Sequence, residues 1–340
     1  MQSPKVSICI PTYNGSAFLA RTLRSISKQT FEDYEVVIVD DQSRDDTVAI
    51  AEQYAATDDR VHVFRNADRS GASARNANRC LTHARGEWIK FLFQDDLMAP
   101  TCLARMLEAG RSGRFVLSWH DYLFAPDVDA KVRAWYESLP SLKTTLPTTY
   151  AGVEDFCNAV LKHWNINFIG PTSASFIHRD CFTAYGPFSS EIVTFPDLEC
   201  WIRLGSHEGL AIVPERLVTF RVHSSSISAR LRDDKAPQFQ HELEPLLLLL
   251  NLARAPDYEN VRMHARKQVP HMDADLLLTR GAISARWKAI DTRYRQRDRS
   301  LLDHWNAVCR THPDLLDVLR EVDAAAGIWP RLKQFLKARF

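Results

Sequence analysis

The first 120 residues alternate between short apolar runs and amphipathic segments, and this alternation constrains the fold more than any other feature. Apolar, β-rich runs lie at residues 6–10, 35–39, 61–64 and 88–93, with helically spaced apolar residues between them at about 18–26, 46–56 and 71–84. Strands separated by helices of this length imply right-handed βαβ crossovers. We therefore expect an α/β fold with a mainly parallel, twisted sheet flanked by helices.

The rest of the chain changes character twice. Strand and helix patterns are mixed from about residue 115 to 222, and strand patterns disappear beyond about residue 229. Helical runs follow at 242–254, 273–288, 300–310 and 315–325. A stretch rich in serine and charge, residues 228–237, separates the two parts. The sequence predicts an α/β domain over residues 1–228 and an α-helical C-terminal region over residues 229–340.

Composition excludes several classes of protein. Forty-three basic and 42 acidic residues give a net charge of +1, so no global field attracts nucleic acid. No run reaches about 18 apolar residues, the length that a membrane span needs. The N-terminus lacks the layout of a signal peptide, and the seven scattered cysteines contain no CxxC pair. These features predict a soluble, cytoplasmic protein with reduced thiols.

Polar side chains gather where three of the predicted strands end. They are Thr12, Tyr13 and Asn14 after the first strand, Asp40 and Asp41 after the second, and Asp95 and Asp96 after the fourth. The carboxyl ends of parallel strands are where such sheets bind ligands. Paired carboxylates there can hold a divalent cation that also contacts phosphate, and a single one can accept from a ribose hydroxyl. The alternative for each acidic pair is a helix cap or a solvated surface.

Seven segments, taken in order, point to one family. They are VSICIPTYNG, LRSISKQTFEDYEVVIVDDQSRDDT, GASARNAN, ARGEWIKFLFQDD, GPTSASFIHRDCFTAYGPFSSE, FPDLECWIRL and VTFRVHSSSIS. Together they resemble the family 2 inverting glycosyltransferases of the GT-A (Rossmann-like) fold over roughly residues 4–228. The resemblance implies a nucleotide-sugar-binding half over residues 1–120 and an acceptor half over residues 121–228. No GxGxxG or GxxxxGK[ST] motif follows the first strand, so dinucleotide and P-loop sites are excluded.

The resemblance also implies roles for individual residues. Those expected to bind the nucleotide sugar are Pro11, Thr12, Tyr13, Asn14, Asp40, Arg75 and Asp95. Asp96 would bind Mn²⁺ or Mg²⁺, which neutralises the diphosphate charge as the glycosidic bond breaks. His223 would be a second metal ligand or a phosphate donor, although a lone histidine is more often structural.

An inverting transfer also needs a carboxylate on the acceptor side to take the hydroxyl proton. In FPDLECWIRL, Trp201 and Arg203 align with the helix that carries this base in the family, which implies Asp197 as the base. Pro196 stands where the family usually has Glu, and Glu199 replaces the following Asp, so Glu199 remains the alternative. Asp197 at a helix start would serve equally as a cap.

These features predict a metal-dependent inverting glycosyltransferase. The donor would be a nucleotide-diphosphate sugar, and a UDP-sugar is the first choice. It would react by single displacement with a hydroxyl of a surface glycan or lipid-linked saccharide. The alternatives are a non-catalytic nucleotide-sugar or glycan-binding module and a sugar nucleotidyltransferase. The presence of Asp95, Asp96 and Asp197 argues against the first, and the absence of a glycine- and basic-rich loop after the first strand argues against the second.

Two further features leave alternatives open. Aromatic residues in the acceptor half, which could stack on sugar rings or form core, are Trp119, Tyr122, Trp135, Tyr136 and Trp164. The last segment, WPRLKQFLKARF, pairs apolar with basic side chains and could lie on the inner face of an anionic membrane, although a basic face on a helix docked on its own domain is the commoner explanation. The helical region could also form a homodimer interface or an acceptor lid.

Overall fold

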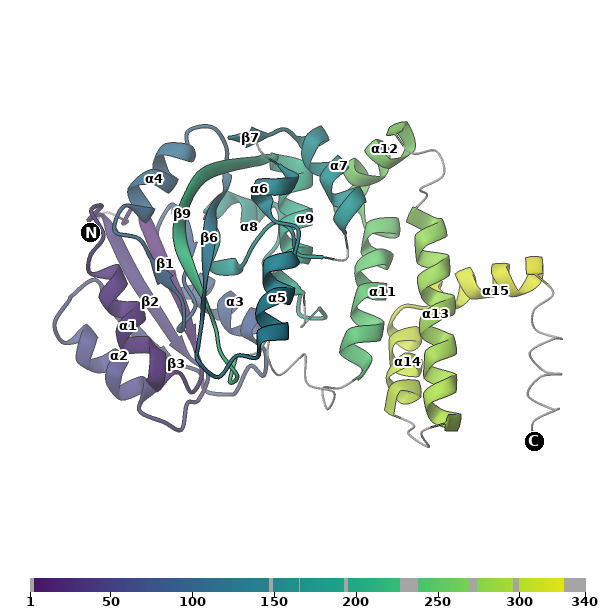
Figure 1. Ribbon diagram of the computed structural model, residues 1–340, viewed down its shortest axis with the longest axis horizontal. Helices are drawn as coiled ribbons and strands as arrows, with labels where there is room; N and C mark the ends of the chain where they lie inside the picture. Colours follow the sequence, from purple (N-terminus) through teal and green to yellow (C-terminus); the bar gives the residue numbers. More distant parts are fainter. Residues whose placement is uncertain are drawn as a thin grey trace. The chain divides into compact units, whose positions relative to one another are not determined.

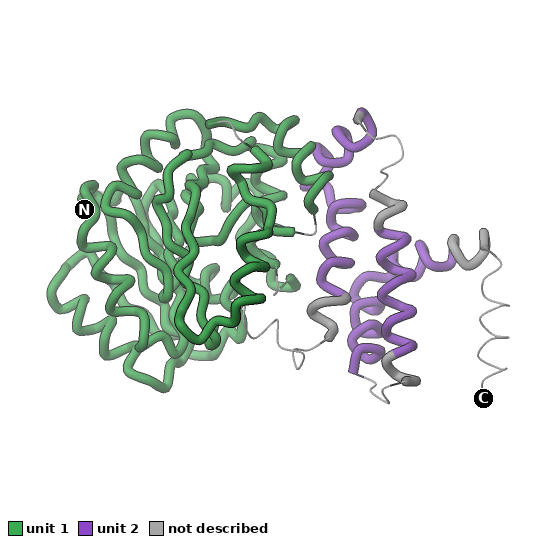
Figure 2. Tube along the Cα trace, in the orientation of Figure 1, with its two compact units in different colours: residues 1–233 green, residues 234–340 purple. Residues whose placement is uncertain are grey.

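The computed structural model describes residues 3–146, 149–164, 166–192, 195–226, 238–268, 274–295 and 300–326. The chain divides into two compact units, residues 1–233 and 234–340 (Figure 2). The stretch at 228–237 expected as a boundary and the last segment, residues 329–340, lie outside the described residues. Each unit is therefore considered by itself.

Within the described residues, the first unit is built on one sheet of nine strands. Their order is β3 (Val61–Arg65), β2 (Tyr34–Asp40), β1 (Val6–Thr12), β4 (Trp88–Phe91), β8 (Ser175–His178), β6 (Phe115–Phe124), β9 (Leu210–Val222) and β5 (Leu97–Met98), with β7 (Tyr150–Ala151) also paired to β9 (Figure 1). The first four are parallel, as predicted. The sheet is mixed beyond them, because β8, β5 and β7 pair antiparallel with their neighbours.

Strand direction decides which ends meet. β8 is antiparallel to both β4 and β6, so β6 runs in the same direction as β4. β9 is parallel to β6 and therefore shares this direction. The carboxyl ends of β1, β2, β4, β6 and β9 consequently lie along one edge of the sheet, which we call the carboxyl edge.

Helices cover both faces of the parallel strands. In chain order the helices of this unit are α1 (Ser16–Ile26), α2 (Thr47–Ala55), α3 (Ser73–His83), α4 (Cys102–Ala109), α5 (Ala130–Ser138), α6 (Leu142–Thr145), α7 (Val153–His163), the 3₁₀ turn η1 (Thr172–Ala174), α8 (Arg179–Tyr185) and α9 (Pro196–Glu208). Ile8 and Ile10 of β1 pack with Leu19 and Leu23 of α1 in one core, while α3 packs on the same strand. All seven residues of β1 are buried for this reason.

The second unit is helical throughout its described residues. Its elements are α11 (Gln238–Arg254), the 3₁₀ turn η2 (Pro256–Tyr258), α12 (Glu259–Gln268), α13 (Ala274–Arg295), α14 (Ser300–Thr311) and α15 (Asp314–Ala326). The leucine run of α11 is buried because α11 packs against α13 and α14. Among the helices that the structure describes, none has the length and apolarity to cross a bilayer. All seven cysteines of the chain are buried free thiols.

Candidate active site

Thr12 and Asp40 meet where β1 and β2 reach the carboxyl edge. Both side chains are buried. Thr12 Oγ1 donates to Asp40 Oδ1 at 3.3 Å, and the amide of Ser43 donates to Asp40 Oδ2 at 2.8 Å. Pro11, one residue earlier, is buried in the sheet opposite Val39. The protein's own donors therefore fix the Asp40 carboxylate at the strand end.

Tyr13 is held by a residue that the sequence did not single out. The Tyr13 amide donates to Gln94 Oε1 at 2.9 Å, and Gln94 Nε2 donates back to the Tyr13 carbonyl at 3.0 Å. A Cβ at position 15 would lie 2.1 Å from Gln94 Oε1, so only Gly15 admits this side chain. The guanidinium of Arg69 lies 4.0 Å from the centre of the Tyr13 ring. Gln94 thus joins the loop after β1 to the loop after β4.

Asn14 points outward on the same loop. It is exposed and has a positive φ of 47°, a conformation that asparagine tolerates better than most residues. Its side-chain oxygen accepts from the Arg44 amide at 2.9 Å. Asn14 therefore fixes the loop after β2 as well as its own.

Asp41 and Arg75 organise the loop before α3. Burial alone would raise the pKa of Asp41, but hydrogen bonds from Ser70 and Asn66 outweigh it and hold the pKa below its usual value. Arg75 is exposed, and its guanidinium donates to the carbonyls of Ser70 at 3.4 Å and Ser190 at 3.0 Å. Arg75 thus bridges two loops of the unit.

Asp95 and His223 form a pair at the carboxyl edge, of which only Asp95 is partly exposed. Asp95 Oδ2 and His223 Nε2 lie 3.0 Å apart, and the Asp95 side chain is 21% exposed. The other ring nitrogen of His223 lies 2.8 Å from the hydroxyl of Ser225, and the ring packs on Phe18 with centres 4.2 Å apart. The end of β9 therefore presents an oriented imidazole to the loop after β4.

Asp96, in contrast, is 1% exposed and fully engaged by the protein. Its Oδ2 accepts from the Ser173 hydroxyl, and its Oδ1 accepts from the Arg221 amide at 3.0 Å. Burial, and then the charge of Asp95, raise the pKa of Asp96 to about 8. The two adjacent carboxylates thus stand in different environments.

Two buried cations, Lys90 and Arg221, support the acidic pair. Lys90 is fully buried in β4 and donates to the carbonyls of Ser173 and, at 3.3 Å, Ser175. Arg221 donates through Nε to the main-chain oxygen of Asp95. Neither was singled out from the sequence, although a lysine inside the apolar run WIKFLF is a detectable signal because lysine is rarely buried without a partner.

Asp197 lies in a separate hydrogen-bonded group at the start of α9. Its Oδ2 accepts from Asn167 Nδ2 at 2.9 Å, and its Oδ1 accepts from the Leu198 amide at 2.8 Å. Burial raises the pKa of Asp197 to about 6, against the lowering effect of these hydrogen bonds. Asn167 is fixed by two hydrogen bonds with the main chain of Gly170, whose oxygen also accepts from Trp201 Nε1. Asp197 is thus both a helix-start residue and an oriented carboxylate.

Glu199, the alternative base, is committed elsewhere. It is buried and accepts two hydrogen bonds from Arg203 at 2.8 and 3.1 Å. Arg203 also donates to the carbonyls of Gly186 and Pro187. This ion pair ties α9 to the loop after α8, so the Glu199 carboxylate is already paired within the protein.

One segment, residues 167–175, links the two groups. Asn167 at its start orients Asp197, and Ser173 near its end binds Asp96. The Ser173 hydroxyl also accepts from the Phe93 amide at 3.0 Å. A shift of this segment would therefore move both carboxylates.

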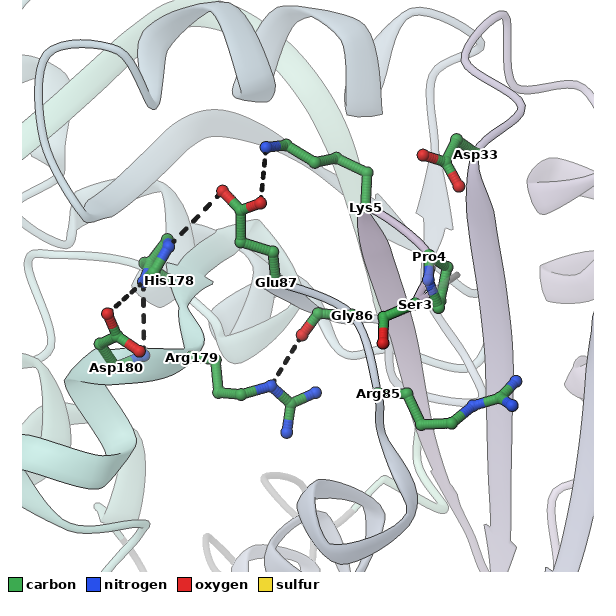
Figure 3. A pocket seen from close by; sticks show the side chains of 10 residues that line it. All are labelled: Ser3, Pro4, Lys5, Asp33, Arg85, Gly86, Glu87, His178, Arg179 and Asp180. Carbon is green, nitrogen blue, oxygen red and sulfur yellow. Dashed lines mark hydrogen bonds and ion pairs between the residues drawn. The ribbon is translucent and has the colours of Figure 1, made fainter. Parts of the chain in front are cut away.

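A cavity of about 470 Å³ lies at the opposite edge of the sheet (Figure 3). Lys5, Glu87 and His178 line it next to the amino ends of β1 and β4 and the end of β8. Lys5 pairs with Glu87 at 2.7 Å, and His178 lies 3.6 Å from the same carboxylate. The cavity contains none of the residues expected to bind a nucleotide sugar.

The sheet and its edge define a GT-A glycosyltransferase architecture, as predicted from the sequence. Residues 7–163 match the family described as Glycosyl transferase family 2. A relative in Mycobacterium tuberculosis, an uncharacterised protein, is 32% identical over 232 residues, which is 67% of this chain and 70% of the relative. The chain belongs to glycosyltransferase family 2.

Other similarities cover less of the sequence or show the fold alone. The GalNAc(5)-diNAcBac-PP-undecaprenol β-1,3-glucosyltransferase of Campylobacter jejuni is 33% identical over 110 residues, 32% of this chain and 36% of that enzyme. TarS of S. aureus with UDP-GlcNAc superposes with a TM-score of 0.63 at 16% identity, covering 94% of this chain and 83% of TarS. The mannosyltransferase PcManGT of Pyrobaculum calidifontis with GDP-Man and Mn²⁺ gives a TM-score of 0.50 at 20% identity, covering 92% and 88%.

Proposed function

We propose that this glycosyltransferase moves a sugar from a nucleotide-diphosphate donor to a hydroxyl by single displacement with inversion. A UDP-sugar is the first choice of donor. One observation carries the proposal: the edge that presents Asp95 and His223 belongs to the same unit as an independently oriented carboxylate, Asp197. Displacement with inversion needs these two groups on opposite sides of the reacting carbon, one at the leaving diphosphate and one at the attacking hydroxyl.

The donor nucleotide would bind over the ends of β1 and β2. We assign base and ribose contacts to the loops around Thr12, Tyr13 and Asp40, with Pro11 and Asn14 shaping the loop. Arg75, exposed at the start of α3, would reach the base or phosphates. The complex of TarS with UDP-GlcNAc supports a UDP-sugar as the first donor to test.

A divalent cation, Mn²⁺ or Mg²⁺, would lie at Asp95 and His223. A partly exposed carboxylate and a neighbouring imidazole are ligand types that suit such an ion, and Mn²⁺ accompanies GDP-Man in PcManGT. Among the residues that the structure describes, no third histidine, cysteine or carboxylate completes a metal cluster, so phosphate oxygens would supply ligands. The expected metal ligand was Asp96, but its burial favours Asp95, with Asp96 holding the loop in place.

Asp197 would act as the general base. Asn167 and the Leu198 amide orient its carboxylate, and its pKa of about 6 lets it remain ionised at neutral pH while accepting a proton. The acceptor hydroxyl would lose its proton to Asp197 as it attacks the anomeric carbon and the diphosphate leaves.

The acceptor would be a glycan or a lipid-linked saccharide. The name of the Campylobacter enzyme, whose acceptor is attached to undecaprenol, supports this class. Peripheral membrane contact through the basic segment at the C-terminus and a homodimer stay hypotheses, as does a location at the inner face of the membrane.

A thermal-shift series tests the donor site. Wild type, Asp95→Asn and Asp197→Asn are melted with UDP, GDP, dTDP or CMP, each with and without Mn²⁺. We expect one nucleoside diphosphate to raise the melting temperature only with Mn²⁺, by mass action. The shift should vanish in Asp95→Asn and persist in Asp197→Asn, which would bind the donor but not transfer the sugar.

The outcomes separate the alternatives. An unchanged shift in Asp95→Asn would remove Asp95 from the metal site. Nucleotide binding without any transfer to a glycan panel would indicate a binding module. NMR of the product decides the stereochemistry, since inversion converts an α-linked donor into a β-linked product.

A further inference from the structure

A continuous cluster of aromatic rings lies on the carboxyl half of β6. Tyr122 is at its centre, with ring centres 5.0 Å from His120, 5.0 Å from Tyr136 of α5 and 6.2 Å from Phe220 of β9. Trp135 extends the cluster, with its ring 5.0 Å from that of Tyr136. Figure 1 shows α5 beside the ends of β6 and β9 that form this part of the edge.

The inner end of this cluster lies beside the group that orients Asp197. The imidazole of His120 lies 3.6 Å from where a Cβ would stand on Gly170. Gly170 binds both oxygen and nitrogen of the Asn167 side chain, and Asn167 donates to Asp197. A chain of neighbouring residues therefore runs from the proposed base through Asn167, Gly170 and His120 to Tyr122.

The outer end of the cluster reaches solvent. Tyr136 is only 7% exposed, whereas Trp135 beside it is 47% exposed. β6 itself changes from four buried residues at Phe115–Ser118 to partly exposed ones, and its register with β9 shifts on both sides of Trp119. Irregularities of this kind re-aim side chains and are frequent next to active sites.

The cluster also lies close to the donor side of the site. Tyr122 pairs with Phe220 in the register of β6 and β9, and Phe220 precedes His223 by three residues. Burial lowers the pKa of the His120 imidazole to about 4, so its ring is uncharged at neutral pH. The rings of His120 and Tyr122, which lie between the proposed base and Trp135, are thus aromatic and uncharged at neutral pH.

We propose that Trp135 and Tyr122 form the acceptor subsite, on which the sugar rings of a saccharide acceptor pack while its reactive hydroxyl lies at Asp197. The inference rests on the proposed function and names the class of acceptor for that site. Aromatic faces match the C–H faces of pyranose rings, and the phenol and indole groups can bond the hydroxyls at the ring rim.

The first experiment observes binding directly. The full-length protein, which has eight tryptophans, is labelled with 5-fluorotryptophan, and the ¹⁹F resonance of Trp135 is assigned by Trp135→Phe. Methyl glycosides and disaccharides of glucose, galactose, mannose and their N-acetylated amines are added with the stabilising nucleotide and Mn²⁺. We expect at least one saccharide to shift Trp135 and to leave Trp287, 37% exposed in the helical unit, unchanged.

The second experiment measures transfer to the saccharide that binds. Trp135→Ala should raise the acceptor KM roughly threefold to tenfold, the range for one aromatic contact, with little change in the donor KM. Because Trp135 is exposed, its loss opens no core cavity. Trp287→Ala is the matched control and should leave both constants unchanged.

Nucleotide binding separates failure of this inference from failure of the proposed function. If a nucleotide binds with Mn²⁺ but no saccharide shifts the Trp135 resonance, or if Trp287 shifts equally, the acceptor subsite is wrong while the donor site stands. An unchanged acceptor KM in Trp135→Ala would also overturn it. If no nucleotide binds, the proposed function fails first.

Discussion

At the scale of single residues, two carboxylates with raised pKa values, Asp96 and Asp197, stand in different surroundings. Asp96 is enclosed by Ser173 and the Arg221 main chain, with Lys90 behind Ser173. Asp197 is partly accessible and is oriented by Asn167. The first arrangement suits a structural anchor for the loop after β4, and the second suits proton transfer.

The pH dependence of transfer should report Asp197. Since its pKa is about 6 and the base must be ionised, kcat/KM should fall as the pH drops below about 6. Asp197→Asn should lower kcat by about 100-fold or more and remove this limb of the profile. Initial rates between pH 4.5 and 8 measure both, and an acidic limb that persists in Asp197→Asn would assign it to another group.

Asp197→Asn, which should lower activity, should raise the stability of the folded protein at neutral and alkaline pH. A carboxyl group whose pKa is raised on folding destabilises the folded state when ionised, above pH 6, and the penalty fades as the pH falls towards its unfolded value near 4. Asp197→Asn should therefore melt higher than wild type at pH 8 and lose this advantage at pH 4. Equal melting temperatures at pH 8 would contradict the burial cost.

Ser173→Ala tests the anchor. The substitution leaves the Asp96 carboxyl and the Phe93 amide without the hydroxyl between them. Unfolding in urea should show a loss of about 1–3 kcal/mol, the cost of unsatisfied buried groups. The exposed Ser27, whose hydroxyl bonds only the preceding turn, is the control, and Ser27→Ala should change stability by less than about 0.5 kcal/mol.

At the scale of elements, the packing of α7 against α9 sets where Asp197 stands. Gly205 of α9 faces the ring of Phe156, and a Cβ there would lie 2.3 Å from that ring. The helices approach this closely only because position 205 has no side chain. Asp197 lies two turns earlier on the same helix, so a displacement of α9 would move it away from Asn167.

Gly205→Ala should destabilise the protein by about 1–3 kcal/mol through overpacking. It should also lower kcat while changing the donor KM little, because α9 carries Asp197. Phe156→Leu in the same chain should recover part of both losses by making room. Gly113→Ala is the control, because its new Cβ would meet Tyr150 and Ala211 at ordinary contact distances of 3.4 and 3.7 Å. Loss of stability with unchanged kcat would show that α9 does not set the position of the base.

At the scale of the whole molecule, every residue placed at the site belongs to the first of the two compact units. Hydrogen exchange with the stabilising nucleotide and Mn²⁺ should therefore slow in peptides from the loops after β1, β2 and β4. Peptides of α11, α13 and α14 should be unaffected. Protection spreading equally through these helices would show that the helical unit takes part in donor binding.

The sequence by itself determined the strands, the edge where polar residues gather and the family, because each rests on local periodicity or on short contiguous motifs. It did not find Gln94, Lys90 or Ser173, whose roles come from contacts about 80 residues away in the chain. The resemblance gave the metal to Asp96 and the nucleotide sugar to Asp95, but no local pattern reveals that Asp96 is buried and Asp95 partly exposed.

Only the tertiary structure decided the surroundings of these carboxylates, because burial and hydrogen-bond partners come from distant segments. Asp96 is enclosed by groups 77 and 125 residues further along the chain. Glu199 is paired with Arg203 one turn along the helix, and Asp197 is oriented by Asn167, 30 residues earlier. A carboxylate's role follows from its surroundings, and the fold assembles these from segments that no local pattern connects.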